Sequence, residues 1–331
     1  MTKRLLILIT LLASAALARD WSKYTAVVVI DRAAVIYAVG DAHSDFVRLS
    51  AALRGAGIID KDENWLAGNA VLVSTGDMID KGPRALDVIS LLRKLRDAAP
   101  AKGGQVVILS GNHESEFMAD PSVPKVREFV AQLKAAGIKA ADVAACKGDL
   151  GEFFCSIAFA ARVGDTFFSH AGNTAGRTVA QLEADIEKDF DKHGFSAQQL
   201  IGDGSVIEAR LNGTGKGREV WLDAGLPKVS EAQLLTNYTK ALGVTRIVEG
   251  HVPSEVRFAD SVTRGTGEMF QRFGSLYLID TGMSEGVDNS LGAVLHLTTG
   301  TATAICPDGK RTQLWDAASH PDTGRAKPCG K

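Results

Sequence analysis

Three polar motifs, each directly after a short apolar run, constrain the fold of this chain more than any other feature. They are residues 40–43 (GDAH), 76–82 (GDMIDKG) and 111–114 (GNHE). Asp77 follows Asp41 by 36 residues and Asn112 follows Asp77 by 35, which is about the length of one βαβ unit. Strands joined by such crossovers are parallel, so their carboxyl ends meet at one edge of a sheet. We therefore predict three parallel strands that bring Asp41, Asp77 and Asn112 together.

Helix signals fill the intervals between these strands. Asp45 is placed to cap one helix, and Pro83 is placed to open a longer one. Ahead of the first motif, residues 26–30 and 35–39 are two β-branched apolar runs separated by a polar pair. We expect these two runs to form a β-hairpin that turns at residues 31–32.

The second half of the chain contains several short β-branched runs with few helices between them. This arrangement favours antiparallel pairing, so we expect a second sheet beside the mostly parallel one. The predicted fold class is α/β, a four-layer α/β/β/α sandwich with mixed sheets in the middle and helices outside. The later runs are Thr166–Ser169, Thr245–Val248, Ser275–Ile279, Ala293–Leu297 and Thr301–Ile305.

A mostly helical, charged region extends from about residue 121 to 242. Within it, residues 125–139 have the pattern of a solvated helical face without a required function. We expect residues 19–331 to form a single domain, with residues 121–242 as a helical insertion.

The first 18 residues have the pattern of a secretory signal peptide. Lys3 and Arg4 precede an apolar run, and residues 16–18 (ALA) fit the small-residue cleavage pattern. The alternative is a membrane anchor, but the apolar stretch is short for a span. We predict a periplasmic or secreted protein that has no membrane attachment once residues 1–18 are removed.

The charge balance argues against two classes of partner, nucleic acids and anionic membranes. Lys and Arg total 37 and Asp and Glu total 39, for a formal net charge of −2, and only 6% of residues are aromatic. Neither a basic surface nor a set of stacking aromatics is expected, so we predict no nucleic-acid partner. The oligomeric state is left open.

Four cysteines permit two disulfides in an exported chain. They are Cys146, Cys155, Cys306 and Cys329, and none forms a Cys-x-x-Cys pair that would indicate a thiolate zinc site. Three pairings are possible, and the nearest pairs in sequence are 146 with 155 and 306 with 329. Free buried thiols are the alternative.

His170 and His251, each after a predicted strand, add two possible metal ligands to the residues of the first three motifs. Oxygen and nitrogen donors without thiolate suit Mn²⁺, Fe or Zn²⁺. Six such ligands exceed the needs of one tetrahedral ion and suit two ions bridged by a carboxylate. We predict two divalent metal ions, with Mn²⁺ favoured. The six residues are Asp41, His43, Asp77, Asn112, His170 and His251.

The motifs and their order resemble those of the calcineurin-like metallophosphoesterases, and among them the phosphoprotein phosphatases. That family has GDxHG, GDxxDRG, GNHE, HGG and GH, and this chain has GDAHSD, GDMIDKG, GNHE, HAG and GH. Residues 279–284 (IDTGMS) are similar to the branch called Shewanella-like protein phosphatases. The resemblance covers about residues 35–297 and implies a sandwich of the metallophosphoesterase type.

The resemblance also implies a role for each matching residue. The first metal would be held by Asp41 and His43, both metals by Asp77, and the second by Asn112, His170 and His251. A hydroxide bridging the metals would attack phosphorus.

An acid is needed to protonate the leaving oxygen, and the resemblance assigns this role to His113. Asp80 would orient His113, since a carboxylate raises imidazole basicity and fixes its tautomer. Glu114 is expected to support the loop rather than to take part in catalysis.

The chain departs from the family pattern in three places. Lys81 replaces the phosphate-binding arginine, which keeps the charge but loses the bidentate fork. Residues 205–210 (SVIEAR) resemble an SPxWxR stretch with Glu208 in the tryptophan position, so Arg210 is the expected second cation and Arg218 the fallback. Substrate would contact Lys81, Arg210 and Asn112. The third departure is Ser44 in place of glycine.

The resemblance implies a metal-dependent phosphomonoesterase that acts on phosphotyrosine or on phosphoserine and phosphothreonine in proteins. The alternative is a small-molecule phosphoesterase acting on nucleotides or dinucleoside polyphosphates. A non-catalytic binding module is a third hypothesis, which the intact metal and acid positions disfavour.

Overall fold

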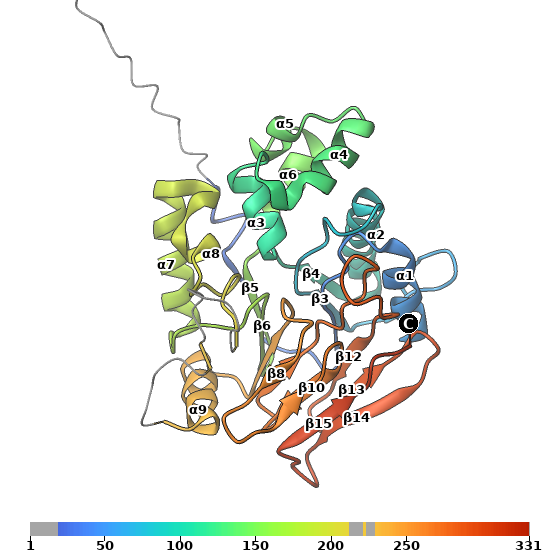
Figure 1. The fold of residues 1–331 in the computed structure, drawn as a ribbon, viewed down its shortest axis with the longest axis vertical. Coiled ribbons are helices and arrows are strands. Elements are labelled where there is room, and N and C mark those ends of the chain that lie inside the picture. The colour runs from blue at the N-terminus through green and yellow to red at the C-terminus, as the bar shows by residue number, and fades with distance from the viewer. Residues whose placement is uncertain (1–18, 212–220, 223–228, 331) are drawn as a thin grey trace, which may run out of the picture.

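Two β-sheets packed face to face occupy the centre of the protein, and helices cover the outside of each (Figure 1). The structure is a computed structural model that describes residues 19–211, 221–222 and 229–330. Both sheets are mixed. The predicted four-layer α/β/β/α sandwich is therefore confirmed.

The six-stranded sheet has the order β14-β13-β12-β2-β3-β4. Strands β2, β3 and β4 are parallel, as the motif spacing predicts, and β12, β13 and β14 add to β2 in antiparallel fashion. The strands are β2 (Ile36–Val39), β3 (Val71–Ser74), β4 (Gln105–Ile108), β12 (Val294–Leu297), β13 (Thr301–Ile305) and β14 (Arg311–Asp316).

The seven-stranded sheet has the order β1-β5-β6-β7-β11-β10-β15. Strands β6, β7 and β11 are parallel, β1 is parallel to β5, and the remaining pairs are antiparallel. Its strands are β1 (Val27–Ile30), β5 (Ala160–Val163), β6 (Thr166–Ser169), β7 (Arg246–Glu249), β10 (Met269–Arg272), β11 (Leu276–Leu278) and β15 (Thr323–Ala326). A separate hairpin pairs β8 (Val256–Arg257) with β9 (Thr263–Arg264).

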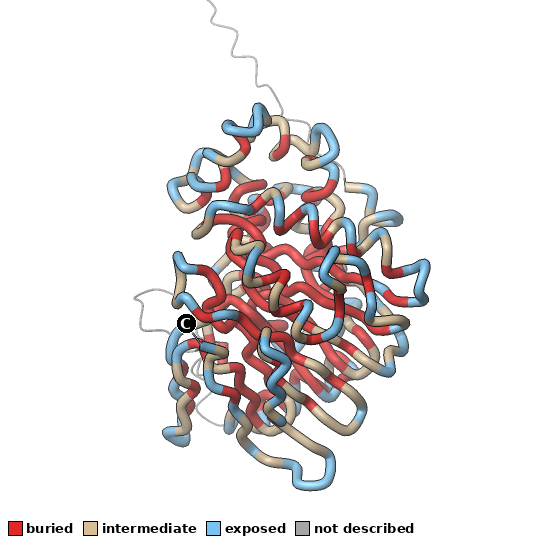
Figure 2. Tube along the Cα trace, turned by 90° about the vertical axis from the view of Figure 1, so that its right-hand side faces the viewer, coloured by how far each residue is buried: buried red, intermediate tan, exposed pale blue. Residues whose placement is uncertain are grey.

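The core has two parts because the sheets are buried on both faces. In β3, Val71 and Val73 belong to a cluster that also contains Phe168 and Val248 of the other sheet. Leu72 belongs to the second cluster, together with residues of the helices. A strand buried on both faces reads as a continuous apolar run rather than an alternating one. Figure 2 shows the buried segments running through the middle of the molecule.

Helices flank both sheets, and a further group lies at the top of the view in Figure 1. The first two helices lie beside β3 and β4, and α7 lies beside β5 and β6. The helices are α1 (Phe46–Gly55), α2 (Ala85–Ala98), α3 (Asn112–Ala119), α4 (Arg127–Ala135), α5 (Ala140–Ala144), α6 (Gly148–Ser156), α7 (Val179–His193), α8 (Gln198–Ile201) and α9 (Glu231–Leu242). Short 3-10 turns span Ala99–Lys102, Pro124–Val126 and Gly194–Ser196. We call residues 120–156, which contain α4 to α6, the cap.

Two local predictions about helices can be compared with the structure. The Asp45 side chain accepts the backbone N–H of Arg48 at 3.0 Å, so its capping role is confirmed. The next helix starts at Ala85, two residues beyond Pro83. A proline before the helix is compatible with this boundary because it lacks an N–H donor.

The predicted hairpin of residues 26–30 and 35–39 is wrong. β1 pairs in parallel with β5 in the seven-stranded sheet, and β2 pairs with β3 and β12 in the other sheet. Residues 31–35 therefore connect the two sheets. β2 has its hydrogen-bonding edges occupied on both sides, which leaves no place for β1 beside it.

The region from 121 to 242 is less uniform than predicted. It holds the helices α4 to α9, but β5 and β6 interrupt them and belong to the seven-stranded sheet. Part of the region lies outside the described residues. Among the described residues, no helix combines the length and the apolar character needed to cross a membrane.

Each cysteine forms a disulfide with the cysteine nearest to it in sequence. Cys146 is bonded to Cys155 within the cap, and Cys306 is bonded to Cys329. The second disulfide joins the C-terminal segment to the turn between β13 and β14. The C-terminal segment also contributes β15, which pairs with β10.

Candidate active site

The loops after β3 and β4 are joined by one buried carboxylate. Glu114 accepts the backbone N–H groups of Asp77 (2.8 Å), Met78 (2.7 Å), Ile79 (3.2 Å) and Gly111 (2.8 Å). Burial raises the pKa of Glu114 to about 7, although the Gly111 N–H opposes the shift. The expected supporting role of Glu114 is confirmed by this bridge between two loops.

Close approach of the backbones explains the glycine at the start of the second motif. Gly76 has φ +104°, and a Cβ there would lie 2.3 Å from the backbone nitrogen of Gly111. Asp77 follows with φ +50°, so the chain turns sharply as it leaves β3. This turn aims the Asp77 carboxylate into the space between the motifs.

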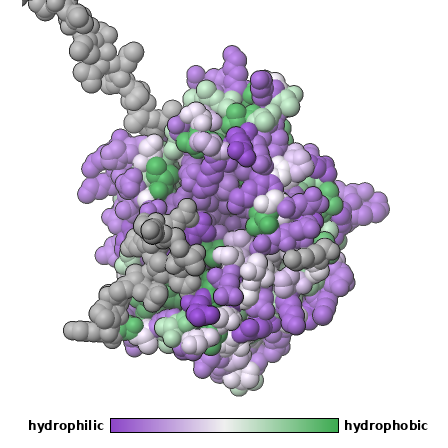
Figure 3. Space-filling view, in the orientation of Figure 1, coloured by the Kyte–Doolittle hydropathy of each residue, from purple (hydrophilic) through white to green (hydrophobic). Residues whose placement is uncertain are grey.

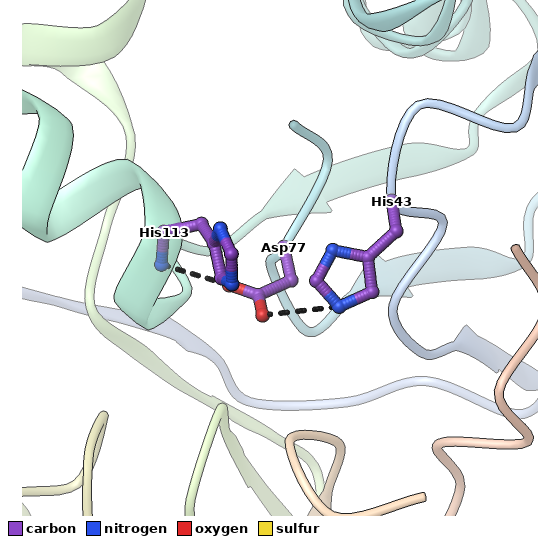
Figure 4. A group of neighbouring side chains, drawn as sticks. All are labelled: His43, Asp77 and His113. Carbon is purple, nitrogen blue, oxygen red and sulfur yellow. Dashed lines mark hydrogen bonds and ion pairs between the residues drawn. The ribbon is translucent and has the colours of Figure 1, made fainter. Parts of the chain in front are cut away.

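Asp77 is the central carboxylate of the site, as Figure 4 shows for three of the residues. Its Oδ2 lies 3.5 Å from Nε2 of His43 and 3.4 Å from Nε2 of His170. Its Oδ1 accepts the backbone N–H of His113 at 3.0 Å. Desolvation opposes ionisation, but the neighbouring histidines hold the pKa of Asp77 well below its usual range.

The second group of ligand types surrounds His170. Its Nε2 lies 3.2 Å from Oδ1 of Asn112 and 3.1 Å from Nδ1 of His251, while its Nδ1 lies 2.9 Å from the carbonyl of Thr75. Burial lowers the pKa of His170, but Asp77 and Asp41 outweigh it and raise the pKa to about 10. Burial lowers the pKa of His251 well below its usual range.

Asp41 is buried but turned toward a backbone donor. Both of its carboxylate oxygens accept the N–H of His251, at 3.2 and 3.0 Å. Burial and the nearby Asp280 raise its pKa well above the usual range. The structure therefore places Asp41 next to the His251 loop, whereas the resemblance pairs it with His43.

These donors fit a pair of divalent cations. Two groups of donor atoms each lie within 4.8 Å of one another, and they share Asp77: His43 with Asp77 and His113, and Asp77 with His170 and His251. Asp41 is in neither group. A shared carboxylate with histidine nitrogens on both sides is an arrangement that can hold two bridged ions.

His113 and Asp80 form a buried pair beside Asp77. Nδ1 of His113 lies 3.1 Å from Oδ2 of Asp80, and the other Asp80 oxygen accepts the backbone N–H of Phe129 at 2.9 Å. The carboxylate thus fixes the proton on Nδ1 and leaves Nε2 for proton transfer. The ring of His43 is inclined by 77° to that of His113, with centroids 5.0 Å apart.

A cleft of about 540 Å³ opens over these residues. Nζ of Lys81 lies 3.3 Å from Nε2 of His43. Nη1 of Arg210 donates to the backbone carbonyl of His251 at 3.1 Å. Arg218 lies outside the described residues. The lining residues are Asp77, Lys81, Asn112, His113, Glu116, Pro124, Lys125, Arg127, Glu128, Arg210 and His251.

The sequence did not predict the contribution of the cap to this cleft. Lys125 and Glu128 were expected on a solvated helical face, but the cap brings both to the cleft. They belong to no motif, so only the packing of the cap reveals them. Figure 3 shows that the surface facing the viewer is largely hydrophilic.

Comparison with known proteins agrees with this geometry. The profile of the family described as calcineurin-like phosphoesterase matches residues 34–255. An uncharacterized protein of Schizosaccharomyces pombe is 28% identical over 264 residues, which are 75% of this chain and 73% of that protein. Shewanella-like protein phosphatase 2 of Arabidopsis thaliana is 35% identical over 79 residues, only 24% of this chain and 20% of that protein.

A solved structure shares the fold. The cold-active protein-tyrosine phosphatase of a psychrophilic Shewanella species superimposes with a TM-score of 0.65 at 19% identity, covering 88% of this chain and 82% of that one. The family match extends over more than half of the chain, including all five motifs. The chain therefore belongs to the calcineurin-like phosphoesterase family and is a metal-dependent hydrolase of phosphoric esters.

Proposed function

We propose that the protein is a phosphomonoesterase that removes phosphate from phosphorylated proteins, acting on phosphotyrosine or on phosphoserine and phosphothreonine. The observation that carries this proposal is the buried His113–Asp80 pair beside Asp77, under a cleft lined by Lys81 and Arg210. The likeness of a 79-residue segment to a Shewanella-like protein phosphatase supports a protein substrate.

The proposed ligand roles follow the resemblance. One ion would be held by Asp41 and His43, both by Asp77, and the other by Asn112, His170 and His251. Because all of these are oxygen or nitrogen donors, we favour Mn²⁺, with Fe or Zn²⁺ as alternatives. When bound, such ions supply positive charge for the phosphoryl oxygens and acidify the attacking water.

The protein's own groups handle the proton and the phosphate. Asp80 holds Nδ1–H of His113, so protonated Nε2 gives its proton to the leaving oxygen. Lys81, Arg210 and the Asn112 amide contact the phosphoryl oxygens. These donors stabilise the negative charge on the equatorial oxygens in the transition state.

A metal-dependence assay tests the proposal. Metal-free protein should not hydrolyse p-nitrophenyl phosphate, and added Mn²⁺ should restore turnover. If the protein binds two ions per chain and still turns over no phosphoester, the non-catalytic binding module is the correct description.

A substrate panel then separates the two classes of substrate. Phosphotyrosine and phosphoserine peptides should have higher kcat/KM than nucleotides or dinucleoside polyphosphates. The opposite order would identify a small-molecule phosphoesterase.

We also propose that the protein acts in the periplasm or outside the cell, with residues 1–18 as a signal peptide and residues 19–331 as one catalytic domain. The two disulfides support an oxidising compartment. N-terminal sequencing of the exported protein should begin at Arg19, and recovery of uncleaved protein in the cytoplasm would contradict the proposal.

A further inference from the structure

Glu208 lies where the related pattern has a tryptophan, and a local turn holds it beside the metal-ligating residues. The Ser205 hydroxyl oxygen accepts the backbone N–H groups of Ile207 at 3.2 Å and Glu208 at 3.0 Å. The carbonyl of Val206 accepts the N–H of Ala171 at 2.7 Å, which ties this turn to the loop that carries His170. The Glu208 side chain is only 10% exposed.

The Glu208 carboxylate contacts the amide end of Asn112. Nδ2 of Asn112 donates to Oε2 of Glu208 at 3.2 Å, and Oδ1 lies 3.2 Å from Nε2 of His170. A carboxylate only accepts hydrogen bonds, whereas an amide has one donating and one accepting end. Glu208 therefore holds the amide with its oxygen toward the other ligands, the orientation in which that oxygen can bind a cation.

The backbone of Glu208 acts on a second ligand. Its carbonyl oxygen lies 3.2 Å from Nε2 of His251, while Nδ1 of His251 faces Nε2 of His170 at 3.1 Å. A carbonyl accepts but cannot donate, so Nε2 carries the proton and Nδ1 keeps its lone pair. Histidine ligands are commonly oriented in this way by a carbonyl or carboxylate outside the coordination sphere.

A residue of the cap, Lys125, also lies near the Glu208 side chain. Nζ of Lys125 lies 3.9 Å from Oε1 of Glu208 and forms an ion pair with Glu116. Lys125 belongs to the 3-10 turn Pro124–Val126, and Glu116 belongs to α3. Oε2 of Glu208 thus accepts from the Asn112 amide, while the Glu208 carboxyl group also interacts with Lys125 and with Glu116.

We propose that Glu208 is a positioning residue, whose carboxylate presents the amide oxygen of Asn112 to the second metal ion. The inference rests on the ligand role proposed for Asn112. Glu208 acts through Asn112 and does not itself bind the metal. Because its backbone carbonyl survives substitution, a side-chain variant changes the contact with Asn112 and leaves the contact with His251 in place.

Calorimetric titration of metal-free protein with Mn²⁺ tests the proposal. Glu208→Ala should weaken one of the two binding events about 10-fold or more, the range found when outer-sphere partners of metal ligands are removed. Glu208→Gln should stay close to the wild type, because its amide oxygen can still accept from Nδ2. Both variants remove the ionisable carboxyl group, so equal losses in the two would show that its charge, and not its contact with Asn112, matters and would overturn the proposal.

A matched control removes a charge from the same cleft. Glu128 is exposed, lines the cleft and makes no hydrogen bond with Asn112 in the described part of the chain. Glu128→Gln should bind both ions with wild-type affinity. Circular dichroism of each metal-free variant shows whether it is folded before titration.

A double-mutant cycle tests whether Glu208 works through Asn112. In an Asn112→Ala background, Glu208→Ala should cause little further loss of Mn²⁺ affinity, because the group it orients is absent. Additive losses would contradict the proposal. The readout is metal affinity, so a wild-type protein that binds two ions without hydrolysing phosphoesters would refute the proposed function and leave this test intact.

Discussion

Nδ1 of His113 lies 3.1 Å from Oδ2 of Asp80, although His113 belongs to α3 and Asp80 to the loop after β3. The second oxygen of Asp80 accepts the N–H of Phe129, a residue of the cap. The acid and the cap are therefore linked through one carboxylate. The orientation of the proposed acid depends on where the cap packs.

Loss of His113 should affect substrates according to their leaving group. His113→Asn should lower kcat about 100-fold or more for phosphoserine peptides, because an alkoxide leaving group needs a proton. The decrease should be smaller for p-nitrophenyl phosphate, whose phenolate leaves without much help. Equal decreases for both substrates, measured with the same bound metal content, would contradict the acid role.

Lys81 should limit phosphate binding because an ammonium group lacks the bidentate geometry of a guanidinium group. Lys81→Arg should lower KM for p-nitrophenyl phosphate about threefold or more, and Lys81→Met should raise it. Steady-state kinetics measure both changes. An unchanged KM in both variants would show that Lys81, although it lies 3.3 Å from His43, does not contact the phosphate.

Ser44 occupies a position where the backbone favours glycine. Its φ is +62°, and its buried hydroxyl has no hydrogen-bond partner in the described part of the chain. Ser44→Gly relieves this conformation and removes an unsatisfied polar group, so it should raise the free energy of unfolding by about 1 kcal/mol. Urea unfolding provides the measurement, and a destabilised variant would show that the side chain contributes packing that outweighs the strain.

The Cys306–Cys329 disulfide should stabilise the protein through the unfolded state. Its 23-residue separation corresponds to about 3 kcal/mol in the chain-entropy model, and the 9-residue separation of Cys146–Cys155 corresponds to somewhat less. The double variant Cys306→Ser/Cys329→Ser should therefore lose more unfolding free energy than Cys146→Ser/Cys155→Ser. Chemical denaturation compares the two, and the reverse order would mean that folded-state contacts of the cap decide the difference.

The three parallel strands and the meeting of their polar ends could be predicted from the sequence. The spacing of the motifs and the continuous apolar runs that precede them can be recognised in short stretches of sequence. In β3, for example, Leu72 is buried on one face of the sheet and its two neighbours on the other. The N-terminal capping of α1 by the Asp45 side chain was predictable for the same reason, since the donor and the acceptor are three residues apart.

Three features follow from long-range packing instead: the sheet that β1 joins, the pairing of the cysteines, and the approach of Glu208 and Lys125 to the site. β1 pairs with a strand about 130 residues away, and Glu208 meets Asn112 across 96 residues of chain. Such contacts depend on how separately formed elements pack against each other. No local sequence pattern predicts that packing, because hydrogen bonds and buried contacts between distant segments form only when the whole chain has folded.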